Sequence, residues 1–250
     1  VTNDLTDGTF FFYPPTLTAD GLPPDPRPRY VLTGTTREGD TGETCDDFQN
    51  PDGSLTIGIF GEIAYDFTDN TISTVQCNEL LPVYCVGVEH AGQVEPRRET
   101  GRLAFVSSPM SVIDVIEADS ICANDAAGAN LDGEFKALVA YPPQAATSGL
   151  DLTGEGWVNR SGLRIFLDPR DIESTIPLTG IAADASGEPV RAVIWTGAAS
   201  PTATSSSQNC SDWTSSAGTT RVGMSTGTDR FFGDTITACT GPSSVYCFQQ

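Results

Sequence analysis

Seven cysteines are the residues of this 250-residue chain that are best suited to chemistry. Their spacing does not suit zinc, because no two of them form a Cys-x2-Cys pair and His90 is the only histidine. In an acidic chain whose only lysine is Lys136, so many cysteines predict an oxidising, extracytoplasmic compartment in which disulfides form. We therefore expect a protein that is secreted or displayed at the cell surface.

Catalytic groups are scarce in the sequence. His90 would be the only imidazole available as a base for a Ser or Cys nucleophile, and it lies in a polar segment that is typical of a surface linker. The phosphate-binding motifs Gly-x-x-x-x-Gly-Lys-Ser/Thr and Gly-x-Gly-x-x-Gly are absent. Paired carboxylates could be chosen almost anywhere among 33 acidic residues, so they indicate nothing. We expect no catalytic residues and no enzymatic activity.

Acidic and aromatic side chains offer the remaining binding chemistry. Asp46, Asp47 and Asp212 stand beside cysteines, where carboxylates commonly cap a turn, and a calcium site is the alternative interpretation. Trp157 could line a platform for a sugar, whereas the other two tryptophans stand at repeated positions and are expected to pack in a core. Calcium is the only ion that we consider these residues able to bind, and no other metal or cofactor is expected.

Net charge and hydropathy argue against two classes of partner. The net charge of −20 argues against nucleic acid, whose binding requires clustered Lys and Arg. No stretch approaches the roughly 18 apolar residues of a membrane span. The acidity has two interpretations. It could serve solubility, or it could support cation-bridged packing or a cationic partner. Because the chain begins with Val1 and has no signal-like apolar region, we expect a mature product from which an upstream segment was removed.

One cysteine-bearing pattern occurs twice in the chain. A shift of 165 residues aligns Cys45 with Cys210, Asp47 with Asp212, Phe48 with Trp213, and Gly58 with Gly223. A shift of 162 residues aligns Cys77 with Cys239 and Val83-Tyr84-Cys85 with Val245-Tyr246-Cys247. Two constant shifts are what a duplicated unit with one shortened loop would produce. The sequence therefore predicts an internal repeat.

Short strands and one main helix are expected to position these residues, since 25 Gly and 17 Pro favour turns over long elements. Short apolar runs predict strands at 30–32, 57–63, 82–88, 103–106, 134–139, 156–158, 164–166 and 193–195. Apolar residues at three- and four-residue spacing predict a helix over about 115–128, with Ala118, Ile121, Cys122 and Ala126 on one face. Residues 198–211 are rich in Ser and Thr and are expected to be an exposed loop.

The helix and its cysteine have no counterpart before residue 18 in the first copy. The first copy is therefore expected to be only the second half of a domain. We predict a half domain at residues 1–88, a polar linker at 89–101 that is punctuated by Pro and Gly, and a complete domain at 102–250.

Residues 102–250 resemble bacterial domains of unknown function that are related to the endostatin and C-type lectin-like folds. The resemblance rests on a series of short motifs in a fixed order, namely Phe105-Val106-Ser107-Ser108, Ala118-Asp119, Cys122, Gly133, Phe135-Lys136-Ala137-Leu138, Ile176-Pro177-Leu178, Trp195-Thr196-Gly197, Cys210-Ser211-Asp212-Trp213, Cys239 and Tyr246-Cys247. It implies an α+β fold of irregular, mostly short antiparallel strands with one main helix, stabilised by disulfides.

The resemblance also implies a disulfide pairing, because in lectin-like folds the helix cysteine bonds to the last cysteine and the two middle cysteines bond together. The implied pairs are Cys122–Cys247, Cys210–Cys239 and, in the half copy, Cys45–Cys77. Cys85 is then left without a partner. It could be a free buried thiol, it could bond to a missing half supplied by another polypeptide, or it could join a second Cys85 or carry a modification.

A structural function is favoured over a catalytic one. We expect a non-enzymatic extracellular structural or adhesive protein that associates with itself, or with a missing complementary fragment, through its incomplete N-terminal unit. The alternative is a monomeric surface module that binds carbohydrate or protein, with glycans as partners. The calcium-lectin triplets that would support sugar binding are missing, since Glu188-Pro189-Val190 breaks the Glu-Pro-Asn pattern and Trp-Asn-Asp does not occur.

Overall fold

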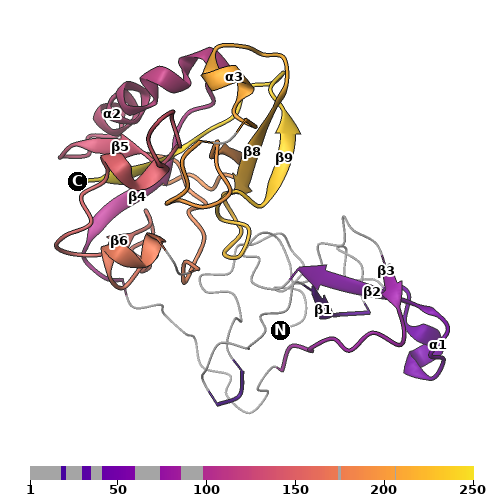
Figure 1. Ribbon diagram of the computed structural model, residues 1–250. Helices are drawn as coiled ribbons and strands as arrows, with labels where there is room; N and C mark the ends of the chain where they lie inside the picture. Colours follow the sequence, from indigo (N-terminus) through magenta and orange to yellow (C-terminus); the bar gives the residue numbers. More distant parts are fainter. Residues whose placement is uncertain are drawn as a thin grey trace. The chain divides into compact units, whose positions relative to one another are not determined.

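The computed structural model describes residues 18–20, 30–34, 41–59, 74–85, 98–173, 176–205 and 207–250. The chain divides into two compact units, Val1–Glu95 and Pro96–Gln250 (Figure 1). His90 and residues 89–97 of the expected linker lie outside the described residues, as do the expected strand residues 60–63 and 86–88. Within the described residues the fold is α+β, with mostly short antiparallel strands, one main helix and three disulfides.

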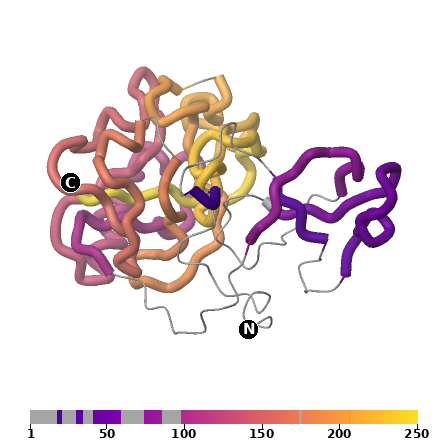
Figure 2. The backbone as a smooth tube through the Cα atoms, turned by 90° about the horizontal axis from the view of Figure 1, so that it is seen from below, coloured from indigo at the N-terminus to yellow at the C-terminus, as the bar shows by residue number. Residues whose placement is uncertain are grey.

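The second unit is organised around its C-terminal strand. Four strands lie in the order β5-β10-β4-β6, with bounds Phe135–Ala137, Tyr246–Gln249, Arg102–Val106 and Trp157–Val158. Strand β10 pairs antiparallel with β4 on one side and with β5 on the other, and β4 pairs parallel with β6. Figure 2 shows this last strand, in yellow, running through the middle of the unit.

The side chains of β10 alternate between two apolar cores. Tyr246, Cys247 and Phe248 are all fully buried, as expected of a strand that is covered on both faces. Cys247 belongs to the core on the side of the helix, together with Phe105 of β4. Tyr246 and Phe248 belong to the opposite core, where Trp157 packs edge-on against Phe248. The strand therefore joins the two cores of the unit.

The main helix begins three residues later than the spacing predicts. A 3-10 helix, η2, spans Val112–Glu117, and the α-helix α2 follows at Ala118–Gly128. The Asp114 carboxylate accepts hydrogen bonds from the backbone N and the hydroxyl of Ser111, which stabilises the start of the tighter η2 turn. The expected apolar face is nevertheless the buried one, since Ala118, Cys122 and Ala126 all lie in the helix-side core.

A second, three-stranded sheet completes this unit. Its antiparallel order is β7-β8-β9, with bounds Val193–Trp195, Thr219–Met224 and Thr235–Ala238. Two short 3-10 helices, η3 at Ala146–Gly149 and η4 at Pro169–Glu173, lie in the connections. The strand expected at 164–166 is wrong, because this segment contributes only one isolated bridge, between Val158 and Arg164. The loop expected at 198–211 is partly wrong, since Ala198 is fully buried and the short helix α3 begins at Cys210.

The first unit contains a sheet of the same design. Its strands lie in the order β1-β2-β3, with bounds Tyr30–Leu32, Ser54–Ile59 and Thr74–Gln76, and the short helix α1 is at Cys45–Phe48. The register matches the second unit, because Val31 pairs with Gly58 as Ile194 pairs with Gly223. The other edge matches too, because Ser54 pairs with Gln76 as Thr219 pairs with Ala238. The two sheets thus share strand order and register.

Three disulfides join segments of the fold, and their pairs are Cys45–Cys77, Cys122–Cys247 and Cys210–Cys239. These are the pairs that the resemblance implies. The first and third bonds tie the short helices α1 and α3 to the third strand of their sheets, over separations of 32 and 29 residues. The second ties α2 to β10 over 125 residues. Cys85 forms no disulfide among the described residues, and the alternative of a buried thiol is wrong because this side chain is exposed.

The separations predict which disulfide contributes most to stability. In the chain-entropy model, removing a bond that closes about 125 residues costs about 5 kcal/mol, and one that closes about 29 residues costs about 3.5 kcal/mol. The double variant Cys122→Ala/Cys247→Ala should therefore be less stable than Cys210→Ala/Cys239→Ala. Chemical denaturation followed by tryptophan fluorescence measures this, and it reports on the second unit alone because Trp157, Trp195 and Trp213 all lie there. Equal losses, or the reverse order, would contradict the prediction.

Candidate functional site

Each unit carries a short turn with a left-handed backbone. In Cys45–Phe48 and in Cys210–Trp213 all four residues have φ between 54° and 63°. The backbone N of Trp213 donates to the carbonyl of Asn209 at 2.9 Å, and Phe48 does the same to Thr44 at 2.6 Å. These are the bonds of one turn of left-handed α-helix, a conformation that disfavours L-residues by roughly 1–2 kcal/mol each. Two separate segments adopt it with the same Cys-x-Asp-aromatic sequence.

Local contacts hold the turn in place. The Asn209 side chain accepts a hydrogen bond from the backbone N of Asp212 at 2.9 Å and donates one to its carboxylate at 2.7 Å. In the first unit, the Thr44 hydroxyl accepts from the backbone N of Asp47 at 3.3 Å. Asp212 therefore takes part in capping the turn, as the first interpretation of these residues holds. Within the described residues, no group of three or more His, Cys, Asp or Glu side chains lies close enough to hold a metal ion.

The aromatic residue of each turn lies against a glycine. Gly197 and Gly34 have φ of 69° and 64°, and a Cβ added to Gly197 would lie only 2.6 Å from the Trp213 ring. A Cβ added to Gly34 would lie 3.1 Å from the Phe48 ring. Only glycine allows this approach, which explains why a glycine stands at both positions.

Trp157, which the sequence left open as a platform for a sugar, is a core residue. Its side chain is fully buried, and its indole N donates to the carbonyl of Gln249 at 2.8 Å. The Arg102 guanidinium covers the ring at 4.3 Å from its centroid. Burial lowers the pKa of Arg102, and nearby carboxylates oppose this shift. The ring therefore presents no face to a sugar.

A Gly-x-Ser-x-Gly sequence occurs at residues 223–227 and escaped the sequence reasoning. Ser225 is fully buried at the end of β8. Its hydroxyl donates to the carbonyl of Val190 and accepts from the backbone N of Ala192, both at 2.9 Å. A nucleophile elbow requires an exposed serine between a strand and a helix. Ser225 is instead a structural link between β8 and the segment that precedes β7.

Repeated positions of the two units differ sharply in exposure. Phe48 is 58% exposed and Val83 is 56% exposed, whereas their counterparts Trp213 and Val245 are 1% and 0% exposed. Cys85 is exposed, whereas its counterpart Cys247 is fully buried in a disulfide. We refer to Phe48, Val83 and Cys85 together as the open face of the first unit.

In the second unit, β4, β5 and α2, with the residues that follow the two strands, cover the positions that match the open face. The Trp213 indole N donates to the carbonyl of Ala140, just after β5. Val245 exchanges hydrogen bonds with Ser107, just after β4, through its backbone N and carbonyl. Cys247 pairs in the sheet with Phe105 of β4 and bonds to Cys122 of α2. The described residues of the first unit include no equivalent of β4, α2 or β5.

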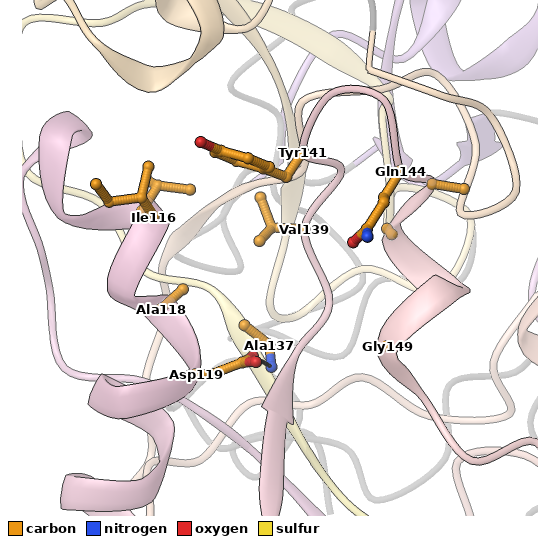
Figure 3. A pocket seen from close by; sticks show the side chains of 11 residues that line it. Ile116, Ala118, Asp119, Ala137, Val139, Tyr141, Gln144 and Gly149 are labelled. Carbon is orange, nitrogen blue, oxygen red and sulfur yellow. Dashed lines mark hydrogen bonds between the residues drawn. The ribbon is translucent and has the colours of Figure 1, made fainter.

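A pocket of about 270 Å³ opens beside α2 in the second unit. Figure 3 shows Ile116 and Tyr141 on one side of it and the Gln144 amide on the other. Ile116 is 59% exposed and Tyr141 is 42% exposed, so both sit at its mouth. The Asp119 carboxylate is already engaged, since it accepts from the backbone N of Ala137 at 2.8 Å and lies 3.2 Å from the Lys136 amine. The pocket combines an apolar wall with few free polar groups.

Comparison of the sequence with protein-family models finds no match, and neither does a search of the curated proteins. The described helices include none that is long and apolar enough to cross a membrane. Of the residues selected from sequence, the structure joins the six expected cysteines in pairs and leaves Cys85 exposed. Asp46 and Asp47 lie exposed on α1 beside the open face. The sequence alone does not single out Phe48 and Val83 as candidate site residues. The signal is their exposure in the structure, where the matching residues Trp213 and Val245 of the second unit are buried.

The left-handed turn predicts an unusual response to glycine. Ser211 is exposed with φ of 54°, so Ser211→Gly should stabilise the second unit by roughly 0.5–1 kcal/mol, because glycine adopts this conformation without strain. Ser216 is also exposed but has no positive φ, so the matched variant Ser216→Gly should destabilise it slightly. Thermal unfolding measures both. A lower melting temperature for Ser211→Gly than for Ser216→Gly would show that the turn is not left-handed in solution.

Proposed function

We propose that this chain is a non-enzymatic, extracellular structural or adhesive protein that assembles with other chains through the open face of its first unit. The single observation that carries the proposal is the exposure of Phe48, Val83 and Cys85, where the repeated positions of the second unit are buried. Three disulfides are in keeping with an oxidising compartment. The protein would serve as a building block and not as a catalyst.

We also propose that the two units are copies of one lectin-like fold. The matched sheets, the left-handed Cys-x-Asp-aromatic turns and the equivalent disulfides support a common origin. On this view residues 102–250 are the complete domain, and the first unit is the C-terminal half of another. The open face is then an interior surface of the fold that lacks its cover.

Magnitudes indicate how strongly this face can bind. Fully burying a Phe or Val side chain contributes about 1.5–3 kcal/mol, whereas association costs about 4–15 kcal/mol in lost freedom of movement. Phe48 and Val83 alone therefore support only a reversible pairing of copies. A lasting assembly requires strand pairing or a covalent bond in addition.

Sedimentation velocity tests self-association of the face without interference from disulfide formation. The Cys85→Ser chain should associate reversibly at concentrations on the order of 10–500 µM. Phe48→Asp in the same background should sediment as a monomer, because an exposed carboxylate cannot enter an apolar contact. Leu167→Asp is the matched control, since Leu167 is 71% exposed in the second unit and should change nothing. Monomeric Cys85→Ser chain throughout this range, or equal effects of the two Asp variants, would refute self-association.

The pocket beside α2 favours a second candidate function, a carbohydrate-binding module. The exposed Tyr141 ring can stack on a sugar, and the Gln144 amide can bond to a hydroxyl. If this function is correct, Tyr141→Ala should weaken binding to an arrayed glycan by roughly 10-fold or more, the equivalent of about 1.4 kcal/mol. Leu167→Ala should have no effect. A glycan array that gives no signal with the wild-type protein would exclude this candidate.

A further inference from the structure

We infer that the open face of the first unit accepts a strand–helix–strand segment of another polypeptide, built like residues 102–137, whose helix cysteine forms a disulfide with Cys85. This inference rests on the proposed function and deepens it by naming the chemistry of the partner. Exposed apolar side chains and a thiol do not identify an occupant on their own. The second unit does, because it shows which elements cover the same positions.

The backbone that leads into the open face is already placed as in the second unit. The backbone N of Leu32 donates to the carbonyl of Pro82 at 2.9 Å, and the backbone N of Trp195 donates to the carbonyl of Ser244 at 2.9 Å. The segment that leads to Val83 and Cys85 is therefore hydrogen-bonded to β1 in the way that the segment leading to Val245 and Cys247 is hydrogen-bonded to β7. Residues 83–85 form no strand of their own and contribute an isolated bridge between Leu32 and Val83, so a partner strand would extend them into the arrangement of residues 245–247.

The second unit shows what this partner contains. Strand β10 lies between β4 and β5, and α2 lies next to β5 (Figures 1 and 2). Tyr246 pairs with Val106 and Cys247 pairs with Phe105. An incoming strand should therefore place an apolar residue opposite Cys85 and run antiparallel to residues 83–85. The helix that follows it should bring a cysteine to Cys85, as Cys122 reaches Cys247.

Residues 102–137 of a second copy are a poor source of this segment. They are already buried in their own unit, and Cys122 is already bonded to Cys247. If a copy donated them to the open face of a neighbour, its own second unit would be left uncovered at residues 245–247. The exchange would therefore cover one face and expose another. The other six cysteines of the chain are bonded to one another, so a helix cysteine for Cys85 must come from a neighbouring polypeptide.

The covalent step is an oxidation of two thiols. Cys85 and the helix cysteine each lose a proton, the two sulfurs form one bond, and the two electrons released reduce a low-molecular-weight disulfide to two thiols. An extracytoplasmic compartment supplies such an oxidant. Cys85 is exposed and can therefore react before or during docking of the segment.

A synthetic peptide of residues 100–138 tests the inference, since it contains the β4, α2 and β5 sequences and one cysteine, Cys122. The full chain is incubated with this peptide in a buffer of oxidised and reduced glutathione, and the linked species are identified by non-reducing peptide mapping. We expect a one-to-one adduct that joins Cys85 to the peptide cysteine. It should form at least 10-fold faster than with a peptide of the same composition in scrambled order.

Matched variants separate docking from thiol reactivity. Phe48→Asp should slow formation of the adduct several-fold while Cys85 still reacts normally with a small thiol reagent, and Cys85→Ser should abolish it. Equal rates with the scrambled peptide, or a peptide bonded only to Cys247, would overturn the inference. A chain that self-associates but does not link the peptide would refute the inference and leave the proposed function standing. A chain that links the peptide but stays monomeric alone would refute self-association and support the inference.

Discussion

The second unit depends on one constraint, that the strand Tyr246–Gln249 must be covered on both faces. Its three consecutive residues Tyr246, Cys247 and Phe248 are fully buried, so apolar side chains point in both directions from a single strand. Two cores form in consequence, and a disulfide from Cys247 to Cys122 fixes the helix over one of them. The Val-Tyr-Cys sequence of residues 245–247 recurs at residues 83–85, where Val83 and Cys85 are exposed. In the proposed assembly, the constraint that organises the second unit would also act on these residues, and a partner would supply the cover.

The left-handed turns show that a rare backbone can be specified by a short sequence. Four successive residues with positive φ are unfavourable for L-residues, yet both Cys-x-Asp-aromatic segments adopt them. A disulfide holds the first residue, a Thr44 or Asn209 side chain caps the third, and the aromatic ring lies against a glycine. These contacts explain the turn without a bound ion. Both units contain this strained turn together with the contacts that hold it.

Sequence reasoning predicts the elements that have a strong local pattern and misses those that do not. The strands at Tyr30–Leu32, Arg102–Val106 and Val193–Trp195 stand out as short apolar runs. The strands Thr219–Met224 and Thr235–Ala238 are rich in Thr and resemble loops, because their pairing partners and not their composition make them strands. The direction of the Trp157 ring depends on long-range packing against Phe248 and Arg102, which no local pattern contains. The open face became visible only when the exposure of repeated residues could be compared.

In the proposed assembly, the stability of the first unit would be linked to its function. Among its described residues, the buried apolar side chains are Val31, Cys45, Leu55 and Ile57. A core with few buried apolar side chains gains little from burial, which is why small domains commonly depend on disulfides or partners. The Cys45–Cys77 bond supplies one such constraint. A segment that covers Phe48 and Val83 would add apolar burial to the same core, and anything that binds only the folded form stabilises it. In the proposed complex, docking of such a segment would therefore stabilise the folded form of the first unit, and assembly and folding would be coupled.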